Sequence, residues 1–91
     1  MGSTNRFVKD PDAIVDYGIP WTAWLVADTI ATSTWVVPTG ITKASDTFTT
    51  TQTTIWLSGG TVGAEYTLVN RITTAAGRTQ DQTIYIRIEE R

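Results

Sequence analysis

The feature that most constrains the fold is an alternation of apolar and polar side chains near the end of the chain. In "QTIYIRI" (residues 82–88), Ile84, Ile86 and Ile88 fall on one side, while Tyr85 and Arg87 fall on the other. Successive side chains of a β-strand point to opposite faces. The stretch therefore predicts a strand with one face on a core and the other in solvent.

A second strand is predicted just before it, over residues 64–74. Tyr66, Leu68, Asn70 and Ile72 would share a face, and the first, second and fourth suit a core. Asn70 does not, so either it bonds a backbone group or a bulge shifts the register near it. The segment "AAGRTQD" (75–81) would join the two strands as a hairpin, and its length predicts a mobile connection.

The rest of the chain shows the same strand-forming character. Threonine, a β-branched residue that suits the solvent side of strands, occurs 19 times. Further strand candidates are residues 13–17, 21–26, 29–37 and 46–58, the last as one long strand or two shorter ones. This pattern predicts an all-β, immunoglobulin-like or fibronectin-type antiparallel β-sandwich of about six or seven strands, with a small barrel as the second choice.

Length allows one domain with a single modest core. We expect residues 1–6 to be a flexible N-terminus and residues 7–91 to be a single β-sandwich domain. No apolar run approaches the length of a membrane span and the polar opening is not a secretory signal, so we expect a soluble protein.

Composition argues against several kinds of function. The net charge is −2, and the seven basic residues are scattered, which predicts no nucleic-acid and no membrane partner. The chain has no cysteine and no histidine. Disulfides, thiolate chemistry, zinc catalysis and Ser/His triads are therefore excluded, and no residue pattern indicates a cofactor.

Carboxylates offer little for catalysis or metal binding. No pair among the nine stands at a spacing that favours a glycosidase, so we predict no enzyme activity. Asp10, Asp12 and Asp16 lie close together in "KDPDAIVDY", where calcium is one interpretation. A turn that begins at Asp10 and continues into an edge strand is the favoured one, because the calcium-loop pattern is missing.

Four tryptophans dominate the aromatic residues. A small sandwich needs one or two of them at its centre, and we expect Trp35 and one of Trp24 or Trp56 there. At least one of the others should be partly exposed and could anchor a partner. Candidate partner-contact residues are Trp24, Trp56 and Arg78.

Two further features have an ordinary structural interpretation. Gly59 and Gly60 are predicted turn glycines and not a phosphate loop, since no helix and no Lys-Ser/Thr pair follows. Arg78 would sit at a loop tip, chiefly as a solvated charge, with a contact across an assembly interface as the alternative.

Residues 6–91 as a whole carry a family resemblance. Its most specific parts are "KDPDA" with its "Y...W..WL" continuation, "WLSGGT", and "ITTAAGR" before the last strand. With these segments the chain resembles small structural proteins of tailed bacteriophages and prophages of the fibre-tail adaptor type. The resemblance implies an immunoglobulin-like virion component without catalysis, made in the bacterial cytoplasm.

The main functional hypothesis is thus a structural or adaptor module that binds other phage tail or fibre proteins, with self-association of its copies as a further expectation. Exposed aromatics and sheet edges would be its adhesive features. The alternative is a small carbohydrate-binding module for host-surface attachment, with Trp24 or Trp56 as the stacking platform.

Overall fold

The computed structural model describes residues 6–90, which form seven strands and one short helix. In chain order they are β1 (Arg6–Lys9), β2 (Val15–Pro20), α1 (Thr22–Leu25), β3 (Ile30–Val36), β4 (Ile41–Phe48), β5 (Gln52–Gly59), β6 (Glu65–Thr74) and β7 (Thr79–Ile88). Within this range no helix is long and apolar enough to cross a membrane.

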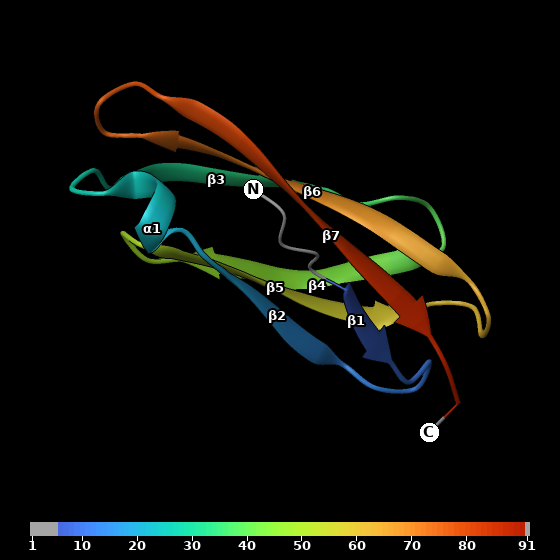
Figure 1. The fold of residues 1–91 in the computed structure, drawn as a ribbon. Helices are drawn as coiled ribbons and strands as arrows, with labels where there is room; N and C mark the ends of the chain where they lie inside the picture. Colours follow the sequence, from blue (N-terminus) through green and yellow to red (C-terminus); the bar gives the residue numbers. More distant parts are fainter. Residues whose placement is uncertain (1–5, 91) are drawn as a thin grey trace.

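The strands form two packed sheets (Figure 1), one in the order β1-β7-β6-β3 and the other in the order β2-β5-β4. All pairs are antiparallel except β1 with β7. The prediction of a mostly β, two-sheet protein is confirmed. The molecule measures 41 × 26 × 19 Å along its principal axes. The strands run along this elongated body, and loops lie at both of its ends.

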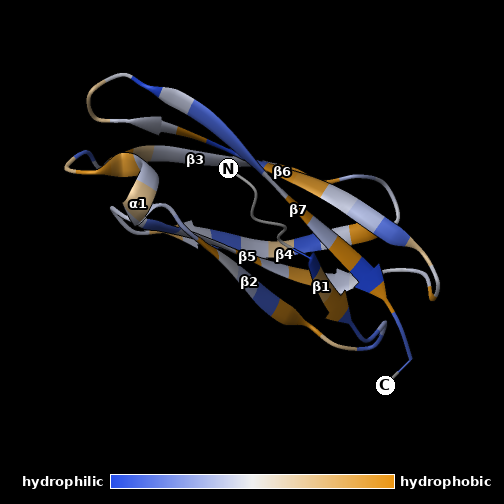
Figure 2. Ribbon diagram, viewed as in Figure 1, coloured by the Kyte–Doolittle hydropathy of each residue, from blue (hydrophilic) through white to orange (hydrophobic). Residues whose placement is uncertain are grey.

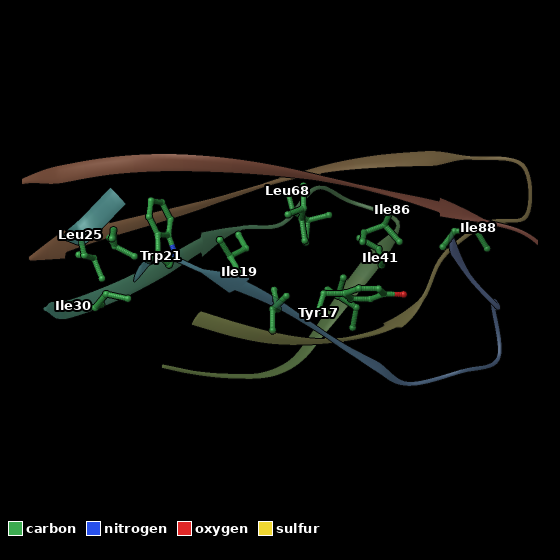
Figure 3. Packing of buried hydrophobic residues seen from close by; sticks show 13 residues of the cluster. Tyr17, Ile19, Trp21, Leu25, Ile30, Ile41, Leu68, Ile86 and Ile88 are labelled. Atoms are coloured by element: carbon green, nitrogen blue, oxygen red, sulfur yellow. The ribbon is translucent and has the colours of Figure 1, made fainter. Parts of the chain in front are cut away.

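The core lies between the sheets, where apolar side chains from both layers meet (Figure 3). The alternation in β7 is confirmed, because Ile84, Ile86 and Ile88 are fully buried. Tyr17 and Ile19 reach the same layer from β2. Packing of these two inner faces supplies the main driving force for folding, at about 25 cal/mol per Å² of apolar surface buried.

Asn70 of β6 is the polar residue at the centre of this core. Its Nδ2 donates to the Ser33 hydroxyl and to the Thr34 backbone carbonyl, both at 2.9 Å. Its Oδ1 accepts from the Thr53 hydroxyl at 2.6 Å and from the Trp21 indole Nε1 at 3.2 Å. The first of the two expectations for Asn70 is confirmed, and the pairing of β6 with β7 keeps one register throughout.

The strand predicted at residues 21–26 is wrong, because Thr22–Leu25 form α1. Trp21, Trp24 and Leu25 stand at positions i, i+3 and i+4, which places them on one face of a helix. Trp21 and Leu25 are buried and Trp24 packs against the core. Pro20 ends β2 just before this turn, and the helical spacing lets three large apolar groups close that end of the sandwich.

Other boundaries also differ from the prediction. Residues 46–58 contain parts of two strands, because Thr49 accepts hydrogen bonds through its hydroxyl from the amides of Thr51 and Gln52 and so forms a turn. Strand β7 begins at Thr79, which shortens the expected connection to residues 75–78. β1 and the first half of β4 were not predicted. The expected flexible terminus lies outside the described residues apart from Arg6, which begins β1.

Candidate functional site

The turn interpretation of the acidic segment after β1 is confirmed. Asp10 Oδ1 accepts the Asp12 amide at 2.8 Å, and the Asp10 carbonyl accepts the Ala13 amide at 3.1 Å. Asp16 lies in β2. No group of three or more potential metal-ligating side chains occurs within residues 6–90. These carboxylates therefore shape a turn and an edge strand.

The four tryptophans are placed differently from the prediction. Trp21 is the fully buried one, with 2% of its surface exposed, whereas Trp35 and Trp24 pack against the core from its margin. Trp56 keeps 38% of its surface exposed. The expectation that Trp35 fills the centre is wrong, since the bend at α1 brings Trp21 there and its indole N–H finds acceptors on Thr53 and Asn70.

Arg78 lies in the turn between β6 and β7, but it is not the freely solvated charge that was predicted. Its Nε donates to Asp28 Oδ2 at 3.1 Å and its Nη2 donates to the Leu25 carbonyl at 2.9 Å. The guanidinium also lies over the Trp24 ring, 4.2 Å from the centroid. Arg78 thus caps the end of α1 and holds one face of Trp24.

Asp28 organises the loop between α1 and β3. Its Oδ1 accepts the amides of Thr29 and Ala76, so one carboxylate joins two loops that are distant in sequence. Hydrogen bonding from Thr74 above all, then from Thr29, Arg78 and Ala76, lowers the pKa of Asp28 against the opposing effect of burial. The carboxylate is therefore held in its charged form around neutral pH.

Backbone hydrogen bonds fix the same region. The Ala75 amide donates to the Thr29 carbonyl at 2.9 Å. The turn after β4 contributes the Thr50 and Thr51 carbonyls, which accept the amides of Ile30 and Trp21. Three connections, residues 26–29, 49–51 and 75–78, are therefore joined at one end of the sandwich (Figure 1). We call this region, together with α1, the α1 end.

Val26 is the feature of the α1 end that no sequence signal revealed. It follows α1 directly, has 83% of its surface exposed, and adopts φ 62° and ψ −103°. A positive φ is a strained conformation for a β-branched residue. The loop it begins lies at the extremity of the molecule and contains both hydrophobic and hydrophilic residues (Figure 2). An apolar side chain is thus presented to solvent directly after Leu25, whose carbonyl Arg78 caps.

Trp56 belongs to a different surface. It lies on β5 between the buried Ile55 and Leu57, and therefore points to the outer face of the β2-β5-β4 sheet. Thr51, which belongs to the α1 end, lies five residues before Trp56, or about 16 Å away along an extended strand. Two of the three predicted contact residues, Trp24 and Arg78, are brought together, and Trp56 is separate from them.

The two glycines predicted in a turn lie where β5 ends: Gly59 is the last residue of the strand, paired with Ile41, and Gly60 begins the connection to β6. Gly59 and Gly60 have φ of 76° and 105°, values that favour glycine. The Gly59 carbonyl accepts a hydrogen bond from the buried Lys9 Nζ at 2.8 Å. Burial lowers the pKa of Lys9, against the influence of Asp10 and Asp12. This end of the molecule is therefore held by a structural lysine and presents no phosphate loop.

Comparison with known proteins identifies a family. A family model described as "Podophage GP4 fiber-tail adaptor protein gp77" matches residues 9–87, the greater part of the chain. A search of curated proteins found no match. The family resemblance seen in the sequence is thereby confirmed.

Proposed function

The chain belongs to the podophage fibre-tail adaptor family, whose members are structural, non-catalytic tail components, and from this premise we propose that its α1 end is the surface that contacts another tail or fibre protein. Trp24 and Arg78 would be anchors of this contact, and the exposed Val26 would add an apolar group to it. An adaptor needs a rigid, exposed and chemically distinctive patch. Arg78 and Val26 are exposed, and the Arg78 guanidinium is fixed over the half-buried Trp24 ring.

The observation that carries the proposal is the exposure of Val26 on strained backbone. Strain of this kind amounts to about 1–3 kcal/mol and persists where the surroundings impose it, often at binding sites. In the free protein the Val26 side chain is exposed, so it buries no apolar surface that would offset the backbone strain. A partner that covers Val26 would turn the exposed apolar surface into buried surface, and the strain would then serve to present the side chain.

The neighbouring pair supports the same surface. Arg78 is fixed by Asp28, Leu25 and the Trp24 ring before any partner arrives, so little side-chain entropy remains to be lost on binding. No acceptor for its Nη1 occurs in the described part of the chain, which leaves donors for a partner oxygen. Tryptophan and arginine are the residue types most enriched at the energetic centres of interfaces.

Finer features of the proposal concern the fold and the assembly. The orders β2-β5-β4 and β7-β6-β3 correspond to the B-E-D and G-F-C orders of an immunoglobulin sandwich, which supports an immunoglobulin-like topology for one domain over residues 7–91. Two of the three joined connections of the α1 end, residues 26–29 and 75–78, would then be the counterparts of the B–C and F–G loops, which are used for binding in that fold. We place the protein in the virion, after synthesis in the bacterial cytoplasm, with self-association of copies as a further expectation.

A matched pair of valine variants tests the contact surface. Val26→Asn changes the α1 end, and Asn tolerates a positive φ. Val62→Asn makes the same change at another exposed valine, in the connection between β5 and β6. Binding to the purified tail and fibre proteins of the same phage should weaken about tenfold or more for Val26→Asn and stay within about twofold for Val62→Asn. The proposal would be overturned if the two variants bound the tail and fibre proteins with equal affinity, or if Val62→Asn alone lost binding.

A further inference from the structure

The outer face of the β2-β5-β4 sheet carries a second surface, centred on Trp56, that the adaptor contact does not use. We propose that this face binds a neutral hexopyranose unit of a glycan, with the Trp56 indole as the stacking platform and Asp16 and Ser45 as hydrogen-bonding partners of the sugar hydroxyls. The proposal concerns a different surface from the α1 end and is independent of it.

The indole is held on the sheet by its own strand. Ile55 and Leu57 on either side of it are fully buried, so the β5 backbone cannot turn Trp56 inward without exposing both. Trp24, the other candidate platform from the sequence, is covered by Arg78 on one face and approached edge-on by Trp21, with ring centroids 5.7 Å apart. Trp56 is therefore the candidate that can offer an aromatic face to a sugar.

Polar groups stand on both sides of the indole. Asp16 of β2 and Ser45 of β4 are the residues directly opposite Trp56 in the two strand pairings, and directly opposite residues share a face of the sheet. Both are exposed. A carboxylate accepts hydrogen bonds and a hydroxyl donates and accepts them, so together they match the hydroxyl groups at the rim of a pyranose ring.

A β-bulge in β4 makes this arrangement possible. Lys43 pairs with Leu57, but the next paired residue is Ser45, opposite Trp56, so Ala44 is the extra residue. Bulges re-aim side chains and are common beside functional sites. Without the extra residue, the methyl group of Ala44 would stand opposite the indole. The bulge replaces it with a hydroxyl.

The composition of the face favours a sugar over a protein partner. Among the outward-facing residues of these three strands, Trp56 and Pro20 are the apolar side chains, and the others are chiefly hydroxyl and amide residues such as Thr42, Thr54 and Ser58. The centre of a protein interface is richer in apolar groups than this. One aromatic platform within hydroxyl groups is instead suited to a ligand with a C–H face and many hydroxyls.

Charge restricts the class of sugar. Asp16 is the charged residue on this outer face, and it is acidic. A uronic or sialic acid would bring a second negative charge close to it, whereas a neutral hexose would not. The site is an open sheet face, so one sugar unit should bind with a dissociation constant of about 1 mM or weaker. Several copies of the protein could raise that affinity through multivalency.

The experiment is a titration of the isotope-labelled protein with methyl glucoside, methyl galactoside, methyl mannoside and methyl glucuronide. It is followed through the indole N–H resonances and through the backbone amide resonances of β2, β4 and β5, which also report binding by a variant that lacks Trp56. At least one neutral glycoside should shift the Trp56 resonance in a saturable way, and methyl glucuronide should not. Trp56→Leu should abolish binding, and Asp16→Asn should weaken it about fivefold or more. Val62→Asn, at an exposed residue outside both surfaces, is the control and should bind as the unchanged protein does.

Three results would overturn the proposal. The first is the absence of a saturable Trp56 shift with any neutral glycoside up to about 50 mM, far above the expected constant. The second is equal binding by Trp56→Leu. The third is a Trp56 shift that follows protein concentration or added tail protein and not sugar, which would make the face a protein interface. The melting midpoints of Trp56→Leu and Asp16→Asn show whether a loss of sugar binding reflects unfolding. If one variant does not fold, the other still tests the site.

Discussion

Replacement of Asn70 by alanine should destabilise the whole protein and loosen the α1 end with it. Asn70 joins the two sheets through Thr53 and reaches Trp21, the N-cap residue directly before α1. It also accepts and donates four hydrogen bonds in all, and no atom of its side chain is exposed. Few single side chains in the described range have so many partners.

The size of the effect can be built from these contacts. Trp21 Nε1 would keep its bond to the Thr53 hydroxyl at 3.1 Å, but the Thr53 hydroxyl would lose its buried acceptor. One unsatisfied buried group costs about 1–3 kcal/mol. Ser33 lies at the edge of the sheet, where water can replace part of the loss. We expect a total of about 3 kcal/mol, or a fall of about 15 °C in the melting midpoint of a domain of this size.

Asn70→Asp is the informative companion. It keeps the volume and the oxygen that accepts from Thr53 and Trp21, but it cannot donate to the Thr34 carbonyl while ionised. Burial without a cation raises the pKa of such a carboxyl, so its penalty is present above that pKa and disappears as the pH falls through it. Relative to the unchanged protein, Asn70→Asp should therefore recover stability in acid, whereas Asn70→Ala should not.

Urea unfolding of Asn70→Ala, Thr53→Val and the double variant measures the network directly. A double-mutant cycle should give a coupling energy of about 1 kcal/mol or more, because the two side chains share a 2.6 Å hydrogen bond. A loss below about 1 kcal/mol for Asn70→Ala together with coupling near zero would refute the reasoning, since buried polar groups in a true network cannot be removed independently.

Three smaller changes test other parts of the structure. Val26→Gly should raise the free energy of unfolding in urea by about 1 kcal/mol through relief of backbone strain, and a loss of stability would contradict that strain. Asp28 has a lowered pKa, so its contribution is present above the unfolded-state pKa and lost as pH falls through the folded one. Asp28→Asn should reduce acid sensitivity below about pH 4, and an unchanged pH profile of thermal melting would contradict this. Gly60→Ala would place a Cβ 2.6 Å from Ile88 Cδ1 at φ 105°, and should lower the melting midpoint by about 10 °C or more; a shift under about 3 °C would count against the packing.

Elements with one buried face could be predicted from the sequence, and the others could not. The isoleucines of β7 and the Leu68 to Ile72 stretch of β6 alternate because one side of each strand meets the core. β4 has no such pattern, since Ile41 is its one buried residue and the rest of this edge strand is more exposed. α1 was missed because a four-residue helix offers too few positions to separate a helical from an extended spacing.

Of the two candidate surfaces, the one around Trp56 could be predicted better from the sequence than the α1 end. The outward direction of Trp56 follows from the buried Ile55 and Leu57 beside it, so local alternation contained that information. The contact between Trp24 and Arg78 joins residues far apart in the chain, and only the packing of α1 against the connection between β6 and β7 creates it. Val26 gave no signal, because its exposure and its positive φ are consequences of how α1 ends.

The shape of the molecule bears on how an adaptor of this size can hold its partners. The body is 26 × 19 Å across its two shorter axes, so one end presents about 500 Å². A stable interface buries about 800 Å² on each partner, so a contact through the α1 end alone would be weak for a single copy. Either the partner also covers the sides of the strands, or several copies bind together and gain affinity from multivalency. Light scattering over a wide concentration range separates these cases, since a lasting oligomer supports the second and a strict monomer supports the first.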